Sequence, residues 1–368
     1  MGFTGCVRRP IGVLCKTIYG HHYTTKSNKG ASFFESRQNK TGFCIIRGLP
    51  SRRCYSVEMS EQLNLIKKLR ERTSAPIKDV KSALCACSWD IEEAQKELRK
   101  RGVILASKKS SRTATQGLLA LAQHEQKAAV IELNCETDFV AKNEIFQLLA
   151  LSLVKLALQV EGSQSFREIP FGPDFLEGKV GFDHPKISGE KTAQNAITEV
   201  AAMMGENIKL RRGYLMSAPS HGVLSSYLHS SPQPGLGRIA GLLSLEVEDQ
   251  NVPLDAVHKV GSEIAMHIVA AKPLFLAKEL VSSDAINNER EILKSQAQST
   301  GKPQVAIEKM VEGRLRKYFE DVVLMEQKFI VNDSVNIKML LDNLSKELGS
   351  PVKITNFQRI EAGEGIQR

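Results

Sequence analysis

Residues 132–143 read Glu132-Leu133-Asn134-Cys135-Glu136-Thr137-Asp138-Phe139-Val140-Ala141-Lys142-Asn143, and the period of the apolar pattern changes within this stretch. Upstream, residues 118–122 and 128–134 are short β-type runs on either side of a polar turn, which predicts a hairpin. Downstream, apolar residues from 139 to 156 recur at three- and four-residue steps with one seven-residue step, which predicts one long helix. The stretch is therefore expected to form a strand-to-helix corner in an α+β fold.

The side chains at this corner leave two interpretations open. Thr137 or Asp138 can cap the helix, and a carboxylate is favoured there by the free amide groups and the helix dipole. Phe139 can either pack beneath the hairpin or stand out as a wedge. Because an exposed Phe gives up roughly 2 kcal/mol of burial, physical chemistry alone favours packing in the core.

Three short helical patterns precede the hairpin, between residues 57 and 106. The first begins at Ser60 with Leu63, Ile66 and Leu69 on one stripe, and the second restarts after residues 73–76. Ser74 can cap that second helix, and Pro76 suits its first turn. A third begins at a capping-box-like Asp90 and Glu93 and is expected to stop at Gly102. Three small helices predict a compact interaction module, and the polar connector 107–115 marks its boundary.

The rest of the chain contains a similar order of elements twice. Residues 161–190 are expected to be a loop, followed by a helix over 192–204, Gly205 and a strand over 208–215. A second α+β unit then predicts strands over 223–228 and 238–247, a helix over 254–271 and a helical pair across 283–326 that turns at 299–303. It ends with a helix over 340–348, Gly349 and a strand over 352–357. Residues 205–210 and 349–354 share Gly-x-x-apolar-Lys-apolar, which indicates two related core subdomains.

The positive charge is confined to the beginning of the chain. The formal net charge is +9, and this excess lies in residues 1–57, so the remainder is neutral overall. Nonspecific binding to nucleic acid needs a standing excess of Lys and Arg, which the body of the chain lacks. The leading segment is rich in Arg, Lys, Ser and Thr and nearly free of acids, as an organelle transit peptide is. A disordered basic arm is the alternative.

Several classes of site are not expected from the sequence. No apolar run approaches the roughly 20 residues that cross a bilayer. After the leader, the three cysteines Cys85, Cys87 and Cys135 make neither a disulfide framework nor a zinc motif. The sequence contains no phosphate-binding loop, and the glycines of residues 235–240 lead into a strand, so no cofactor or metal is predicted.

The corner resembles the signature of elongation factor Ts, a family in which a Thr-Asp-Phe-Val tip enters the nucleotide domain of elongation factor Tu. Residues 69–73 (Leu-Arg-Glu-Arg-Thr) and 81–84 (Lys-Ser-Ala-Leu) are similar to the family's other signature. Further pieces match in order at residues 205–208, 265–273, 308–314 and 361–366. The resemblance covers about residues 58–368.

The resemblance implies an α+β fold with a small N-terminal three-helix, ubiquitin-associated-like module and a core of two related α+β subdomains with a helical hairpin. The implied domains are a mitochondrial transit peptide over 1–55, the module over 56–106 and core subdomains over 107–218 and 219–368, the last including the pair 283–326. Arg53-Cys54-Tyr55 before Ser56 resembles a matrix-peptidase cleavage site, so the mitochondrial matrix is the expected location.

The resemblance also implies a function without covalent chemistry. The chain would be a guanine nucleotide exchange factor that binds GDP-bound or nucleotide-free elongation factor Tu, disturbs its magnesium and phosphate site, and promotes GDP release. Binding to nucleic acid or a membrane is not expected. The implied partner contacts are Thr137, Asp138, Phe139 and Val140 at the tip, Ile77 and Lys78 in the module, Met204 with Gly205, and His229. Pro76 and the Ser- and Pro-containing segment after His229 depart from the family's pattern.

Two other functions compete with this interpretation. A cysteine-dependent enzyme would use Cys135 as nucleophile with a histidine base, although Glu136 and Asp138 nearby would suppress the thiolate. A generic ubiquitin-associated-like adaptor would bind its partner through residues 58–106 without the core.

Overall fold

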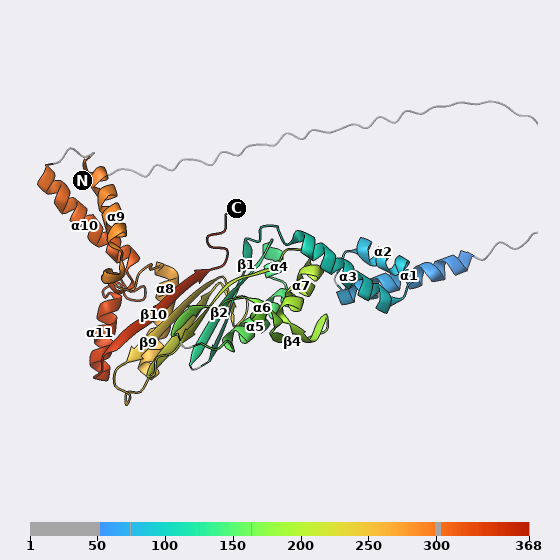
Figure 1. The fold of residues 1–368 in the computed structure, drawn as a ribbon, viewed down its shortest axis with the longest axis horizontal. Helices are drawn as coiled ribbons and strands as arrows, with labels where there is room; N and C mark the ends of the chain where they lie inside the picture. The colour runs from blue at the N-terminus through green and yellow to red at the C-terminus, as the bar shows by residue number, and fades with distance from the viewer. Residues whose placement is uncertain (1–51, 74, 125, 163, 299–302, 368) are drawn as a thin grey trace, which may run out of the picture. The chain divides into compact units, whose positions relative to one another are not determined.

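The computed structural model describes residues 52–73, 75–124, 126–162, 164–298 and 303–367 (Figure 1). The chain divides into two units, Met1–Ser51 and Arg52–Arg368, of which the second contains the described elements. The predicted leader falls almost wholly outside the described residues, as do the Ser74 cap and residues 299–302 of the predicted turn. Helix α1 begins at Arg52, ahead of the predicted boundary between the leader and the module.

The N-terminal module contains the three predicted helices, α1 (Arg52–Thr73), α2 (Ile77–Ala86) and α3 (Ile91–Lys109). As predicted, the Asp90 carboxylate caps α3 by accepting a hydrogen bond from the Glu93 N–H at 2.9 Å. The predicted start at Ser60 is wrong, because Ser60 lies inside α1, and Leu63 is exposed rather than inward. The module has its own small core, formed by Leu69, Val80, Ala83, Leu84 and Ala94.

Helix α3 continues through Gly102, where the sequence predicted its end. A Cβ atom built on Gly102 would lie only 2.9 Å from the Cβ of Ala202, which belongs to helix α7 (Ala193–Met204). Gly102 therefore permits close packing of α3 on α7 instead of stopping the helix. Pro76 also differs from the prediction, since it occupies the position before α2 rather than its first turn.

The first sheet has five strands in the order β3 (Phe166–Glu168), β6 (Lys209–Ser217), β2 (Lys127–Cys135), β1 (Gln116–His124) and β8 (Leu236–Gly237). The predicted hairpin is confirmed as the antiparallel pair β1 and β2, in which Gln116 lies opposite Cys135. Helices α5 (Glu144–Leu158) and α7 pack on one face of this sheet. Residues that alternate along β2 supply that core: Ala129, Ile131, Leu133 and Cys135.

The second sheet has three antiparallel strands in the order β10 (Val352–Glu361), β9 (Ile239–Val247) and β7 (Gly222–His229). Helices α8 (Asp255–Ala271) and α11 (Ile337–Leu348) cover one of its faces. The remaining faces of the two sheets pack on each other through a shared cluster that includes Leu119, Val130, Met216, Leu224, Leu242 and Ile360. Both sheets are thus buried on two sides, with helices outermost (Figure 1).

The two halves of the core repeat one another in topology. The strand order β6-β2-β1 in the first half corresponds to β10-β9-β7 in the second. In both halves a helix ends at a left-handed glycine and a strand of that order follows, with φ of 70° at Gly205 and 68° at Gly349. The prediction of two related α+β subdomains is confirmed.

Two predictions about the first half are wrong. Residues 161–190 are not a loop but contain β3, α6 (Pro173–Glu177), β4 (Lys179–His184) and β5, which runs over Ile187–Thr192. The expected long helix is broken into a single turn, α4 (Asp138–Ala141), and α5. The break arises because Asn143 caps α5, accepting a hydrogen bond from the Ile145 N–H at 2.9 Å.

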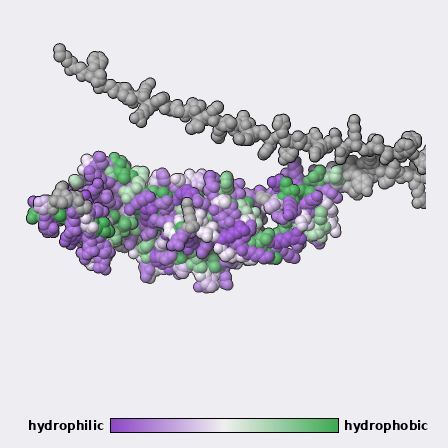
Figure 2. Space-filling model, turned by 90° about the horizontal axis from the view of Figure 1, so that it is seen from above, coloured by the Kyte–Doolittle hydropathy of each residue, from purple (hydrophilic) through white to green (hydrophobic). Residues whose placement is uncertain are grey.

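The predicted helical pair is formed by α9 (Ser283–Gln298) and α10 (Gln304–Val322), which share an apolar seam that includes Leu293, Ile307 and Val311. Short helices η1 (Lys278–Leu280) and η2 (Leu324–Glu326) lie on either side of the pair. Throughout the described part of the chain, every helix is too short or too polar to cross a membrane. On the face seen in Figure 2, hydrophobic residues form separate areas among hydrophilic ones.

Candidate functional site

The corner at residues 135–143 presents one aromatic ring to solvent. Strand β2 ends at Cys135, and the single turn α4 follows before α5 begins. Val140 and Ala141 are 7% and 4% exposed and pack in the core beneath the first sheet, whereas Phe139 is 79% exposed. Successive side chains on a helical turn point about 100° apart, so inward-facing Val140 and Ala141 leave Phe139 pointing outward. The expectation from burial alone, that Phe139 packs in the core, is wrong.

Two charged side chains accompany the exposed ring. The Asp138 carboxylate forms an ion pair with the Lys142 ammonium at 2.8 Å, one helical turn away. The hydrogen bond from Lys142 holds the pKa of Asp138 below its usual value, so the carboxylate is ionised at neutral pH. The Lys142 nitrogen lies 6.0 Å from the centre of the Phe139 ring. The tip, which we define as Thr137–Lys142, therefore combines an anion, an apolar ring and a cation.

Thr137 is fixed by a residue distant in the sequence. The Thr137 N–H donates to one oxygen of the Glu206 carboxylate at 3.0 Å, and the Thr137 hydroxyl donates to the other at 2.6 Å. Thr137 occupies the N-cap position of α4, but its side chain makes no capping hydrogen bond there. Because the hydroxyl hydrogen is directed at Glu206, Thr137 anchors the tip to the segment after α7.

A second carboxylate makes the reverse connection. Glu136, next to Thr137, accepts a hydrogen bond from the Asn207 N–H at 2.7 Å. The Asn207 side-chain amide in turn donates to the carbonyls of Ser110 and Arg112 at 3.1 and 2.6 Å. Each of the segments 136–137 and 206–207 thus supplies a carboxylate that accepts a hydrogen bond from the other segment. Neither Glu206 nor Asn207 was predicted to have a role, although they are the two residues after the predicted contact Gly205.

The structure brings together some of the predicted contacts and separates others. Met204 is half-buried and Gly205 exposed at the end of α7, immediately before the Glu206 that binds Thr137. Ile77 and Lys78 are exposed in the first turn of α2, and His229 is exposed at the end of β7. Among the described residues, no hydrogen bond or ion pair joins these three side chains to the tip. Buried Val140 presents little side-chain surface to a partner.

Cys135 is enclosed directly behind the tip. Its side chain is buried, and its sulfur lies 3.1 Å from the carbonyl oxygen of Thr137. Burial, reinforced by the negative charge of Glu206, raises the pKa of the Cys135 thiol to about 12. A buried, protonated thiol is a poor nucleophile at neutral pH, which removes the main support for a cysteine-dependent enzyme. The described residues also include no cluster of His, Cys, Asp and Glu suited to a metal ion.

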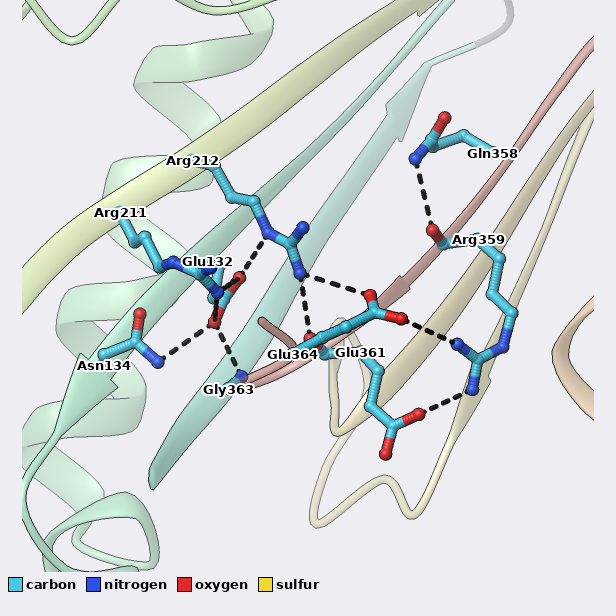
Figure 3. Close-up of polar contacts among 9 residues, drawn as sticks. All are labelled: Glu132, Asn134, Arg211, Arg212, Gln358, Arg359, Glu361, Gly363 and Glu364. Atoms are coloured by element: carbon cyan, nitrogen blue, oxygen red, sulfur yellow. Dashed lines mark hydrogen bonds and ion pairs between the residues drawn. The ribbon is translucent and has the colours of Figure 1, made fainter. Parts of the chain in front are cut away.

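The strand that carries the tip also contains a buried carboxylate, which the sequence analysis did not single out (Figure 3). Glu132 is 1% exposed and accepts hydrogen bonds from Arg211 at 3.1 Å, Arg212 at 2.6 Å, Asn134 at 3.0 Å and the Gly363 N–H at 2.7 Å. Burial by itself would raise the pKa of Glu132, but the hydrogen bonds from Gly363, Arg212 and Asn134 together lower it. The sequence feature that could have revealed this site is the presence of a charged residue within the apolar run of β2.

This network attaches the end of the chain to the first sheet. Arg212 donates to the Glu361 carbonyl at 3.0 Å and contacts the Glu364 carboxylate at 3.5 Å. Arg359 pairs with the Glu361 carboxylate at 2.6 Å and with Glu364 at 3.6 Å (Figure 3). Together with Gly363, these contacts fix the turn after β10 against β2 and β6. The strand behind the tip is therefore braced from both halves of the core.

Comparison with known proteins assigns the chain to a family. Residues 136–364 match the family model described as Elongation factor TS. The chain is 62% identical, over its whole length and 97% of the relative's, to "Elongation factor Ts, mitochondrial" of Arabidopsis thaliana. The protein of the same name from Ricinus communis is 72% identical over 98% of this chain and 94% of its own length. "Elongation factor Ts" of Paramagnetospirillum magneticum is 40% identical over 83% of this chain and 92% of its own length. The chain therefore belongs to the elongation factor Ts family.

Proposed function

We propose that this chain is a guanine nucleotide exchange factor for elongation factor Tu in mitochondrial translation. Membership of the elongation factor Ts family implies nucleotide exchange on that partner, and the names of the plant relatives support the mitochondrial role. An exchange factor forms no covalent intermediate. It binds the nucleotide-free partner more tightly than the nucleotide-bound one, and reciprocal coupling then requires that it weaken nucleotide binding.

The observation that carries the proposal is the exposure of Phe139 on a braced corner. An exposed aromatic ring surrounded by charged neighbours is typical of an interface anchor. We infer that Phe139 enters the nucleotide domain of the partner and that Asp138 helps to disturb its magnesium site. Weaker magnesium binding would remove the charge that holds the diphosphate, so GDP would leave faster. Neither step requires a cofactor or metal bound to this chain.

The other predicted contacts would supply docking surface and orientation. Ile77 and Lys78 would bind the partner from the N-terminal module, Met204 and Gly205 from beside the tip, and His229 from the second half of the core. The exposure of Ile77, Lys78, Gly205 and His229 supports these roles. We further propose domain boundaries at residues 55/56, 106/107 and 218/219. The last lies between β6 and β7, whereas 55/56 and 106/107 lie inside α1 and α3.

We propose that the working protein resides in the mitochondrial matrix after removal of residues 1–55. The basic, acid-poor composition of this segment and the site before Ser56 support processing there. N-terminal sequencing of the protein recovered from isolated mitochondria tests the assignment. A mature N-terminus near residue 56 is expected, and an intact residue 1 in the matrix form would contradict it.

The test of the exchange function is the release of fluorescent GDP from mitochondrial elongation factor Tu. The mature chain is expected to accelerate release, and Phe139→Ala is expected to reduce the acceleration at least about tenfold, as removal of an interface anchor does. Asp138→Ala should reduce it too, because it removes the charge directed at the magnesium site. Met339→Ala, which truncates another exposed apolar side chain, serves as the matched control. Equal release by wild type and both tip variants would contradict the tip mechanism.

A further inference from the structure

We propose that Glu206 is a positioning residue for nucleotide exchange, which holds the tip in the orientation that inserts Phe139 into the partner. The inference rests on the proposed exchange function and adds a residue to it. Glu206 need not touch the partner, because its carboxylate is already engaged with Thr137 through both oxygens. Its role would be exerted through the tip alone.

The contact between Glu206 and Thr137 restricts both the backbone and the side chain of the tip. One carboxylate oxygen accepts a hydrogen bond from the Thr137 N–H and the other accepts one from its hydroxyl. A change in the backbone or in the side-chain torsion of Thr137 therefore breaks a hydrogen bond to a carboxylate. Such charge-assisted bonds are stronger than neutral ones. Phe139 lies two residues further on and, at 79% exposed, has little packing of its own to fix its direction. The direction of its ring therefore depends on how α4 is anchored.

Helix α4 is anchored at two points. Val140 and Ala141 fix its end by burial in the core of the first half, and Thr137 fixes its start through Glu206. With the first anchor alone, the single turn could tilt about its buried end and carry the ring with it. A turn of four residues gains little stability from its own hydrogen bonds, so the second anchor supplies the missing constraint.

Glu206 is itself well placed to act as an anchor. Asn207, the next residue, is 6% exposed and bound to Glu136, Ser110 and Arg112. Before it, the Gly205 carbonyl accepts a hydrogen bond from the Lys109 ammonium. The segment 205–207 is therefore tied to the end of α3 and to the connector before β1. Predicted contacts at Gly205 and at the tip would consequently meet the partner as one rigid surface.

The test compares single-turnover GDP release from elongation factor Tu across a range of factor concentrations. Glu206→Ala removes both acceptor oxygens from Thr137. The maximal release rate is expected to fall about tenfold while the half-saturating concentration changes less than about twofold, because docking elsewhere persists. Thr137→Val, which removes only the hydroxyl donor, should lower the maximal rate by a smaller factor. Glu190→Ala, at an exposed ion pair with Lys179, is the matched control.

A double-mutant cycle separates positioning from a general structural effect. If Glu206 acts through the ring, Glu206→Ala should change the rate less than about twofold once Phe139→Ala is present. Equal effects in both backgrounds, or an unchanged maximal rate in the single variant, would overturn the positioning role. Failure of the exchange function itself would look different, because then neither the wild type nor any variant would accelerate GDP release.

Discussion

The Glu132 carboxylate lies between Arg211 and Arg212, where its ionisation couples the stability of the core to pH. Its folded pKa is depressed, so it contributes stability that is fully present above the unfolded pKa and is lost as pH falls through the folded value. The relevant window lies below the ordinary value of 4.5. At neutral pH the charge is matched by two guanidinium groups and the Gly363 N–H (Figure 3).

Replacement of Glu132 by Gln is expected to lower the free energy of unfolding by about 3 kcal/mol at pH 7, since it leaves two partly buried guanidinium groups without their buried counter-charge. Urea unfolding at pH 7 and at about pH 3.5 would measure the effect. The difference between wild type and variant should narrow at the lower pH, because the Glu132 carboxyl binds a proton more readily in the unfolded wild-type chain than in the folded one, where its pKa is lowered. A gap that widens on acidification would contradict this account.

Cys135 should resist alkylation in the folded chain, because its thiol is buried and has a pKa of about 12. Cys85 is exposed and provides an internal reference on the same molecule. Iodoacetamide labelling at pH 8, followed by peptide mass spectrometry, should modify Cys85 and leave Cys135 unmodified until denaturant is added. Rapid labelling of native Cys135 would restore the enzyme interpretation.

For single residues, local roles such as helix capping could be predicted from the sequence more reliably than the direction in which a side chain points. Asp90 as a helix cap and Gly205 as a helix stop follow from local chemistry and are confirmed. The burial preference of Phe139 was misleading because Val140 and Ala141 occupy the inward-facing positions of the single turn α4, which leaves Phe139 pointing outward. Glu206 was missed because its partner Thr137 is 69 residues away.

Helices α3 and α7 pack closely at one small-residue contact, where Gly102 meets Ala202. A glycine inside a helix costs about 1 kcal/mol relative to alanine, so its presence there requires a packing reason. The close approach provides one, and it fixes α3 against the first half of the core. Helix α3, which contributes Ala94 to the module's core, thus also packs on the first half of the larger core.

Gly102→Ala is expected to destabilise the chain by about 1 kcal/mol, because overpacking at Ala202 outweighs the gain in helix propensity. Thermal unfolding and amide exchange of α3 would measure it. Ala202→Gly introduced into the same chain removes the clashing methyl group and should restore the lost protection of α3. If Gly102→Ala were as stable as wild type or more so, the close contact would not be a constraint.

Gly205 and Gly349 form a matched pair at the ends of α7 and α11. Both have positive φ, and a Cβ atom at either would meet open space or only the flexible end of Lys109. Substitution by Ala should therefore cost about 1 kcal/mol of stability at each site through backbone strain alone. Only Gly205→Ala should also slow GDP release, because only that glycine adjoins the tip. Equal exchange rates in the two variants would argue against a contact at Gly205.

Elements with strong periodicity or clear stop signals were predictable, among them the β1–β2 hairpin, α7, α8 and the helical pair. The region 161–190 was not, because β4 and β5 are short and pair only with each other. Few apolar residues attach this hairpin to the core. Val180 and Phe182 alternate as strand residues do, but an alternation of only two apolar residues is too short to predict a strand. Its many polar and glycine residues looked like a loop.

At the scale of the whole molecule, two topologically related halves place their sheets face to face. The short repeated motif after Gly205 and Gly349 was enough to predict the relationship, since each half ends with the same helix-glycine-strand order. How the sheets pack could not be predicted, because strands buried on both faces lack a simple alternation. The Glu132 network, which joins the end of β10 to β2 and β6, is a product of that packing.

The arrangement concentrates rigidity behind one exposed corner. The strand that carries the tip lies within the first sheet, packs against the second, and is pinned at Glu132 by the turn after β10. Force applied to Phe139 by a partner would thus be transmitted into a braced core instead of being absorbed by a mobile loop. Such rigidity is what an exchange factor needs if it is to displace groups in its partner rather than yield to them.

The most direct measurement is the affinity of the chain for elongation factor Tu in its nucleotide-free and magnesium–GDP-bound forms, determined by titration under the same conditions. Exchange by intrusion of the tip predicts that the nucleotide-free form binds at least about tenfold more tightly, and that Phe139→Ala reduces this ratio towards one. Equal affinities of the wild-type chain for the two forms, or a preference unaffected by Phe139→Ala, would contradict it.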